Sequence, residues 1–285
     1  MACSICGSTH NTLRAQVQRV AYYKCHGCGV VYQSPMPSAD AIGEIYGQDN
    51  EGYFVSDTKN ANHIEGEAWL RETARFFISL LAQQLGLRGA GAWKACNVLD
   101  FGCGTGILLS ELHKHGAAVT GVEMSPWACE YGRKHFGLTM HNEDILAVDL
   151  PPQHFDVITM SHVIEHLPDP VKIVQRLASL LKPNGLLMIA TPHAESLGAK
   201  VFGSTWLYYL PDEHLHLFDA PSLQNVVEQA GLRVSNVQYY LWRKRSTLGA
   251  VARLAWAAVR QLGSHNKQRV SAKDGIIVFA RKPRG

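Results

Sequence analysis

The chain has 285 residues, 46% of them hydrophobic, and its 27 basic and 24 acidic side chains leave a formal net charge of +3. So small a charge gives no argument for nucleic acid as a partner, and no apolar run approaches the ~18 residues of a membrane span. The N-terminal residues do not have the pattern of a secretion signal, so the seven cysteines are expected to be reduced thiols of a cytoplasmic protein. The length suits one full domain and one small one.

The first 36 residues carry two Cys-x2-Cys pairs, Cys3 with Cys6 and Cys25 with Cys28, separated by 18 residues. Each pair can form a turn that directs both sulfurs at one ion, and thiolates at this spacing suit tetrahedral zinc. Because four cysteines fill the coordination sphere, residues 1–36 are predicted to form a ribbon around a structural zinc, which would stabilise a region whose core is thin. Its strands are expected at 17–23 and 30–33.

Residues 37–94 are predicted to be a mainly helical lead-in. A short helix is expected over 39–46, opened by the serine that precedes it. A polar, glycine-bearing surface loop that contains Tyr53 follows over 47–64. Apolar residues recur at helical spacing over 65–87, which predicts a helix packed on the main domain.

The stretch from 97 to 106 reads Asn-Val-Leu-Asp-Phe-Gly-Cys-Gly-Thr-Gly and is followed by apolar residues at helical spacing. This pattern predicts a buried strand, a tight turn and a helix. The alternate glycines permit positive φ and let a ligand approach the backbone, and the helix N-terminus offers unpaired N–H groups. A second strand ends at Glu123, 23 residues after Asp100. This offset is close to the ~20 residues at which a ribose-binding carboxylate follows such a turn.

Strand and helix patterns alternate through the rest of the chain. Further strands are expected at 155–160, 185–190, 232–241 and 275–281, and helices at 126–136, 168–181 and 221–230. This alternation indicates a doubly wound sheet that is parallel over most of its extent. Ligands of such sheets bind at the carboxyl ends of the strands.

The glycine turn, Glu123 and the sequence Ser-His-Val-Ile-Glu-His-Leu after the strand at 155–160 resemble the class I S-adenosylmethionine-dependent methyltransferases. Their first motif has the G-x-G-x-G spacing found here, whereas the dinucleotide dehydrogenases, the less favoured alternative, have G-x-G-x-x-G. The resemblance covers roughly 95–285 and implies a Rossmann-like, doubly wound, mostly parallel sheet of seven strands. It also implies that the loop with Tyr53 covers the cofactor.

The same resemblance implies how S-adenosylmethionine is bound. The glycine turn would cradle the methionine part, whose amino group would face Asp100, and Glu123 would accept both ribose hydroxyls. Asp144 and Ile145 would bracket the adenine, and residues after the strand at 155–160 would line the methionine side. The expected cofactor-binding residues are Asp100, Gly102, Cys103, Gly104, Gly106, Glu123, Met124, Asp144, Ile145, Ser161 and His162.

Residues 192–220 are rich in aromatic side chains and histidines, and we interpret them as a lid over the acceptor site. The alternative is a hydrophobic plug between sheet and helix. Methyl transfer depends mainly on aligning donor and acceptor, but a hydroxyl acceptor also needs a base. Histidine, with an ordinary pKa of about 6.5, suits that task near neutrality. The candidates, in order of preference, are His214, His193 and His162, and His166 and His216 are also eligible.

Residues 242–273 are a basic insertion with a predicted amphipathic helix over 247–262. The favoured interpretation is that this helix packs on its own domain or on a second subunit. The alternatives are contact of 243–273 with anionic lipid headgroups and binding of a phosphorylated substrate.

A zinc ribbon before a class I core resembles bacterial methyltransferases of sugar and surface-polysaccharide pathways, and the core also resembles the ubiquinone-pathway O-methyltransferases. These resemblances imply O-methylation of a small acceptor, glycan-related or nucleotide-linked. The alternatives are sugar C-methylation, an RNA or protein methyltransferase guided by the ribbon, and a cofactor-binding subunit without turnover. With only Arg14, Arg19 and Lys24 as basic residues, the ribbon gives RNA binding little support.

Overall fold

The computed structural model describes residues 1–38, 67–89, 91–241 and 274–284. The predictions for the helix at 39–46, the loop at 47–64 and the basic helix at 247–262 lie outside the described residues. Of the helices that are described, none has the length and apolar character needed to cross a membrane.

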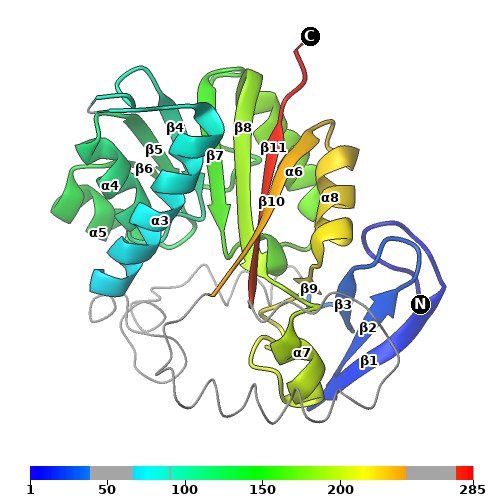
Figure 1. Ribbon diagram of the computed structural model, residues 1–285. Helices are drawn as coiled ribbons and strands as arrows, with labels where there is room; N and C mark the ends of the chain where they lie inside the picture. The colour runs from blue at the N-terminus through cyan, green and yellow to red at the C-terminus, as the bar shows by residue number, and fades with distance from the viewer. Residues whose placement is uncertain (39–66, 90, 242–273, 285) are drawn as a thin grey trace.

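A seven-stranded sheet forms the centre of the molecule (Figure 1). Its strands are β4 (Asn97–Phe101), β5 (Ala118–Val122), β6 (Thr139–His141), β7 (Phe155–Ser161), β8 (Leu181–Pro192), β10 (Arg233–Tyr240) and β11 (Gly275–Arg281). They lie in the order β10-β11-β8-β7-β4-β5-β6. The strands from β8 to β6 are parallel to one another, whereas β11 is antiparallel to both β8 and β10. The predicted doubly wound, mostly parallel sheet of seven strands is confirmed.

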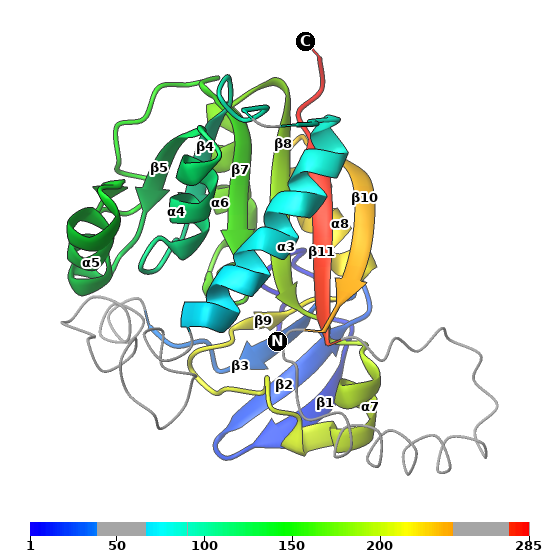
Figure 2. The ribbon, with the colours of Figure 1, turned by 60° about the vertical axis from the view of Figure 1, so that its left-hand side comes forward.

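Helices cover both faces of this sheet. They are α3 (Glu67–Leu85), α4 (Ile107–Lys114), α5 (Pro126–Phe136), α6 (Pro170–Leu180) and α8 (Ala220–Gln229). The alternation of side chains along each strand decides which helices it contacts. In β4, Val98 joins the apolar cluster of α3, and Leu99 joins the cluster of α6 and α8 on the other face. Figure 2 shows α3 crossing the front of the sheet, with α6 and α8 behind it.

Helix starts follow the capping signals in the sequence. The side chains of Ser125, Asp169 and Asp219 each accept a hydrogen bond from a backbone N–H in the first turn of α5, α6 and α8. Each of these helices also has a proline in its first turn, where no N–H is needed. The caps therefore fix the residue at which each of these helices begins.

A second sheet joins the ribbon to the lid. It contains β1 (Asn11–Val17), β2 (Val20–Cys25), β3 (Val31–Ser34) and β9 (His216–Leu217), in that order. The ribbon strand predicted at 17–23 corresponds to β2, which begins three residues later, because a hairpin turn with Gln18 at φ 52° separates it from β1. Since β9 belongs to residues 192–220 and pairs with β3, ribbon and lid share one sheet.

The lid contains a short helix, α7 (Leu197–Phe202), followed by a 3-10 turn. Its aromatic side chains Trp206, Tyr208 and Tyr209 are buried in one cluster with Tyr22 of β2. These aromatics therefore fill the space between lid and ribbon. Figure 2 shows this smaller sheet, at the bottom of the view, beneath the carboxyl ends of β7 and β8.

Candidate functional site

The turn after β4 brings bare backbone to the edge of the sheet. Gly102, Gly104 and Gly106 all have positive φ. A Cβ on Gly102 would collide with Val163, and one on Gly106 would lie 2.5 Å from Leu138, so both positions require glycine. Gly106 is the N-cap of α4, whose first N–H groups lie beside the turn.

Cys103, inside the same turn, faces away from this edge. Its sulfur is 3.9 Å from that of Met140, in the apolar cluster between α4 and α5. Burial raises the pKa of Cys103 well above its ordinary value. A contact from residue 103 to a ligand in the turn would therefore come from its backbone.

Glu123, directly after β5, points at the glycine turn. The backbone N–H groups of Gly104 and Ser125 donate to its two carboxylate oxygens, at 2.9 Å and 3.0 Å. Burial raises the pKa of this carboxyl. Each oxygen keeps a further lone pair, so the carboxylate can still accept two hydroxyl groups, as the ribose of an adenosyl cofactor requires.

Two exposed apolar side chains lie beside predicted cofactor residues: Met124 follows Glu123, the predicted ribose ligand, and Leu146 follows Asp144 and Ile145, which were predicted to bracket the adenine. Met124 is 45% exposed and Leu146 is 41% exposed, and a flat apolar base would cover such surface. Asp144 is held by the N–H of Leu146, which donates to its Oδ1 at 2.8 Å. The side chain of Ile145 is packed in the core at 1% exposure, so this residue could reach an adenine only through its backbone.

Asp100 is buried under the glycine turn. The hydroxyl of Thr159, on β7, donates to its Oδ1 at 2.6 Å. Burial raises the pKa of Asp100 to about 7. Thr159 was not predicted, because its sequence position inside an apolar strand gives no signal of this partner.

His162 follows β7 in the left-handed region, with φ 55°, a conformation that costs energy for residues other than glycine and is concentrated at functional sites. Its Nδ1 lies 3.1 Å from Oε1 of Glu165, and its Nε2 lies 3.0 Å from the hydroxyl of Tyr240. A ring proton on Nδ1 would face this carboxylate, which only accepts, and would leave Nε2 as the basic nitrogen. Ser161, before it, is the last residue of β7.

Glu165 is fully buried in the 3-10 turn Ile164–His166. Thr191 donates to its Oε2 at 2.9 Å. Burial alone would raise the pKa of Glu165, but the contact with His162 and the nearby imidazoles of His166 and His214 lower it to about 2. The result is an ionised carboxylate that holds His162 at the carboxyl end of β7.

The other predicted bases lie in different surroundings. His214 is buried, its Nδ1 donates to the carbonyl of Tyr208 at 2.8 Å, and burial lowers its pKa to about 3. A group that releases its proton so readily is a weak base. His193 is buried at the end of β8, with its ring 5.0 Å from that of Tyr239. His162 differs from both in its position directly after β7, where Glu165 is its carboxylate partner.

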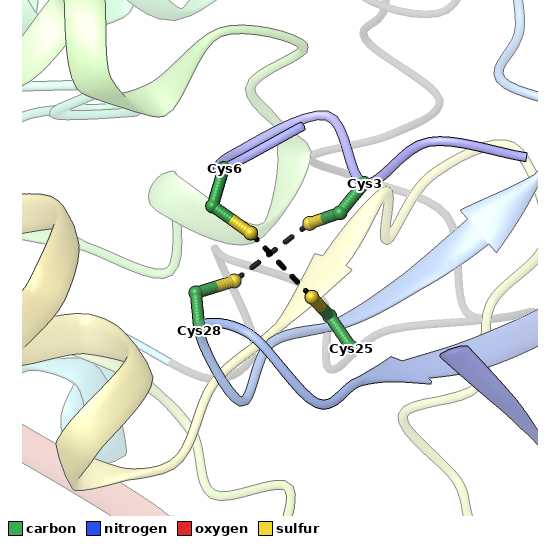
Figure 3. Close-up of side chains that lie close together, drawn as sticks. All are labelled: Cys3, Cys6, Cys25 and Cys28. Carbon is green, nitrogen blue, oxygen red and sulfur yellow. Dashed lines mark hydrogen bonds between the residues drawn. The ribbon is translucent and has the colours of Figure 1, made fainter. Parts of the chain in front are cut away.

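The four ribbon cysteines converge on one point (Figure 3). The sulfurs of Cys3 and Cys28 are 3.7 Å apart, those of Cys6 and Cys25 are 3.5 Å apart, and all four lie within 4.8 Å of one another. Tetrahedral zinc with bonds of about 2.3 Å requires sulfurs about 3.8 Å apart, so this arrangement fits the ion. The contact between Cys3 and Cys28 lowers the pKa of Cys3 and raises that of Cys28, because one thiol of the pair donates to the other.

A second group that could hold a metal lies at the end of β7. Ligand atoms of Glu165, His166 and His214 are within 4.8 Å of one another. The Nδ1 atoms of both histidines face backbone carbonyls, of Glu213 at 2.9 Å and of Tyr208 at 2.8 Å. Histidines that bind metals commonly donate their other nitrogen in this way, which leaves Nε2 as the ligand atom.

Together, the glycine turn, the acid after the next strand and the ordered histidine define a class of protein. It is an α/β protein that binds an adenosyl cofactor at the carboxyl edge of its sheet.

Comparisons with known proteins agree. A family described as methyltransferase domain matches residues 62–237, more than half of the chain. A ubiquinone biosynthesis O-methyltransferase of Coxiella burnetii is 32% identical over 171 residues, which are 56% of this chain and 70% of the relative. The enzyme of the same name from Haemophilus ducreyi is 32% identical over 159 residues, 50% of this chain and 67% of the relative. The chain belongs to the class I S-adenosylmethionine-dependent methyltransferases.

Solved structures share the fold at low sequence identity. The 1,6-didemethyltoxoflavin-N1-methyltransferase of Burkholderia thailandensis, with bound S-adenosylhomocysteine, has a TM-score of 0.56 and 15% identity, covering 96% of this chain and 100% of that one. The [4+2]-cyclase SpnF has a TM-score of 0.52 and 18% identity, covering 81% and 86%. Their names state different chemistries, so the likeness concerns the fold and not the acceptor.

Proposed function

We propose that this methyltransferase methylates a hydroxyl oxygen of a small acceptor, with His162 as the general base. The observation that carries the proposal is the pair of His162 and Glu165 at the carboxyl end of β7, 3.1 Å apart. We propose His162 as the base and not His214, which the sequence analysis preferred, because burial lowers the pKa of His214 to about 3.

The cofactor would be held by side chains of β4, β5 and the loop after β6. Glu123 would accept the ribose hydroxyls, Asp100 would face the methionine ammonium group, and Met124 and Leu146 would flank the adenine, with Asp144 at its amine. When bound, S-adenosylmethionine supplies an electrophilic methyl group on a sulfonium that leaves as a neutral thioether. The protein's task is then alignment and removal of one proton.

His162 would perform that proton transfer. Its Nε2, which contacts the Tyr240 hydroxyl at 3.0 Å, would take the proton of the acceptor hydroxyl as the oxygen gains its methyl group. The ionised Glu165 would stabilise the resulting imidazolium at Nδ1, as a buried carboxylate does for a catalytic histidine. After the methylated product leaves, Nε2 would release that proton to solvent and again accept from the Tyr240 hydroxyl.

Replacing His162 tests this role against His214. For His162→Gln we expect kcat to fall by about 10²- to 10⁴-fold with unchanged affinity for S-adenosylmethionine, since only a general base is removed. The matched control His214→Gln should keep kcat within about tenfold. Single-turnover methyl transfer and calorimetric cofactor binding measure both. Equal losses in the two variants would contradict the assignment.

The acceptor is proposed to be glycan-related or nucleotide-linked. Its support is the resemblance of a ribbon-plus-core chain to sugar-pathway methyltransferases, whereas the names of the relatives favour a hydroxylated intermediate of ubiquinone biosynthesis. A panel that contains nucleotide-linked sugars and hydroxylated aromatic rings, read by mass spectrometry for the gain of about 14 Da that one methyl group brings, separates these classes. Methyl attached to carbon or nitrogen would contradict O-methylation.

We also propose that Cys3, Cys6, Cys25 and Cys28 bind a structural zinc. The support is the closed set of four sulfurs at distances that suit tetrahedral coordination. Metal analysis of the purified chain should give one zinc per chain. A metal-free protein of full stability would contradict the proposal.

A second candidate for the acceptor site is metal-assisted methyl transfer. The observation that favours it is the set of Glu165, His166 and His214, whose imidazoles both present Nε2. A divalent cation there would lower the pKa of a coordinated hydroxyl. In that case the His214→Gln variant would lose activity as strongly as His162→Gln, and added Mg²⁺ or Mn²⁺ would raise the rate of the wild type.

A further inference from the structure

Ser4 lies between the two cysteines of the first pair and contacts a buried histidine of the lid. Its hydroxyl is 2.7 Å from Nε2 of His216. The other ring nitrogen of His216 is 3.0 Å from the carbonyl of Leu167, and because a carbonyl only accepts, Nδ1 is the donor. His216 is fully buried, so one imidazole spans the distance from the cysteine turn to residue 167.

Residues 161–167, which we call the catalytic segment, end at this contact. The segment carries both His162 and Glu165, and its 3-10 turn covers Ile164–His166. Leu167 is the C-cap of that turn. The hydrogen bond from His216 therefore holds the end of the turn that presents the Glu165 carboxylate to His162.

Backbone hydrogen bonds run in parallel with this side-chain link. Tyr32 of β3 is paired with His216 of β9, and the N–H of Gln33 donates to the carbonyl of Leu215 at 3.0 Å. The N–H of Leu215 in turn donates to the carbonyl of Glu165 at 2.8 Å. Two routes thus connect the ribbon with the catalytic segment.

The apolar packing is continuous along the same path. Cys3, Cys25 and Cys28 belong to the buried cluster that also contains Ile164 of the catalytic segment and Phe218 after β9. A change in the cysteine turns therefore reaches residues that pack directly on the catalytic segment, since close-packed interiors transmit displacements.

We propose that the ribbon is a positioning element of the catalytic site, which acts through Ser4 and His216 on the catalytic segment. Ser4 and His216 are positioning residues, because neither contacts His162 or Glu165 directly. The proposal rests on the function proposed for His162 and on the zinc proposed for the four cysteines. It assigns the ribbon a part in methyl transfer itself, in addition to stabilising the fold.

The test compares Ser4→Ala with two matched variants. Ser4→Thr keeps the hydroxyl, and Ser8→Ala removes a hydroxyl of the same loop that accepts from the N–H of His10 at 3.2 Å. Loss of one hydrogen bond should lower kcat of Ser4→Ala by about tenfold without a change in KM, zinc content or cofactor affinity. Ser4→Thr and Ser8→Ala should behave like the wild type.

Nuclear magnetic resonance of protein labelled with ¹⁵N-histidine supplies a readout besides activity. In Ser4→Ala, the ring signals of both His216 and His162 should move, whereas in Ser8→Ala both should stay in place. A Ser4→Ala protein with wild-type kcat and an unmoved His162 signal would overturn the proposal. If the wild-type chain contains no zinc, only the zinc centre is refuted. If His162→Gln keeps the wild-type kcat, only the role of His162 as the base is refuted. In both cases the ring signal of His162 still reports the link from Ser4.

Discussion

The cofactor half of the site and the acceptor half are built in different ways. The cofactor half uses residues 100–146, which are close in sequence, and many of its polar groups belong to the backbone. The acceptor half, as proposed, combines His162 and Glu165, which are three residues apart, with Thr191, Tyr240 and the positioning residue Ser4, which lie far from them in the chain. The proposed cofactor site therefore depends on consecutive strands and helices within one stretch of the chain, whereas the proposed acceptor site depends on how ribbon, lid and sheet pack together.

Loss of the proposed zinc should give the largest difference between the two halves, because it should impair the acceptor half and leave cofactor binding intact. Structural zinc sites contribute roughly 10 kcal/mol or more to folding, so Cys25→Ser should lose the metal and the ordered ribbon. We expect methyl transfer to be abolished while the cofactor still binds to the sheet. Metal analysis, calorimetric unfolding and cofactor titration measure this. Cys96→Ser, which changes a cysteine outside the ribbon, is the control and should retain zinc and methyl transfer. Equal loss of zinc and activity in both variants would contradict the assignment of the metal to the ribbon.

Replacing Glu123 should damage the cofactor half alone. Two hydrogen bonds to a charged group contribute about 1.5–3 kcal/mol each, so Glu123→Ala should weaken binding of S-adenosylmethionine by about 100-fold or more. Glu130→Ala, on the exposed side of α5, is the matched control. Isothermal titration measures both affinities. Unchanged affinity in Glu123→Ala would show that the ribose lies elsewhere.

The smallest effect is a pH dependence that arises from Asp100. Its pKa of about 7 in the free protein means that the carboxyl binds a proton below neutrality, whereas the cofactor's ammonium group favours the carboxylate. Affinity for S-adenosylmethionine should therefore rise about tenfold from pH 6 to pH 8. Asp100→Asn should remove this dependence, and a pH dependence that persists in the variant would assign it to another group.

The same raised pKa sets the sign of a stability effect. The folded protein holds the proton of Asp100 more tightly than the unfolded chain, in which an aspartate has a pKa of about 3.9. Without cofactor, the contribution of Asp100 to stability is therefore largest at low pH and decreases as the pH rises towards about 7.

The sequence predicted where the residues proposed for the cofactor lie in the fold, whereas it carried less signal for the contacts at the proposed acceptor site, and the difference has a physical reason. Alternate glycines and an acid at a fixed offset are constraints on neighbouring residues, and they placed Gly102 and Glu123 at the correct strand ends. Tyr240 and Thr191 reach His162 and Glu165 through tertiary contacts that no local pattern encodes. The same holds for β9, whose two residues form a strand only because β3 lies beside them.

Local sequence signals also gave wrong strand bounds or side-chain positions where tertiary packing determines them. The strand predicted at 185–190 is β8, Leu181–Pro192, because Leu181 pairs with Phe155 although Pro183 and Asn184 look like a turn. Ile145 was expected at the adenine, but its side chain fills the core and Leu146 is the exposed neighbour. Leu146 is the direct neighbour of Ile145, whereas β8 begins four residues before the predicted strand, and in both cases burial and strand pairing decided the outcome.

The central claim is that His162 and Glu165 remove the acceptor's proton as one unit. Single-turnover methyl transfer by His162→Gln, Glu165→Gln and the double variant tests it most directly, with cofactor affinity measured for each protein as the check on folding. Residues that act as a unit are not additive, so we predict that the double variant is as slow as His162→Gln within about threefold. Losses that multiply in the double variant would contradict the account.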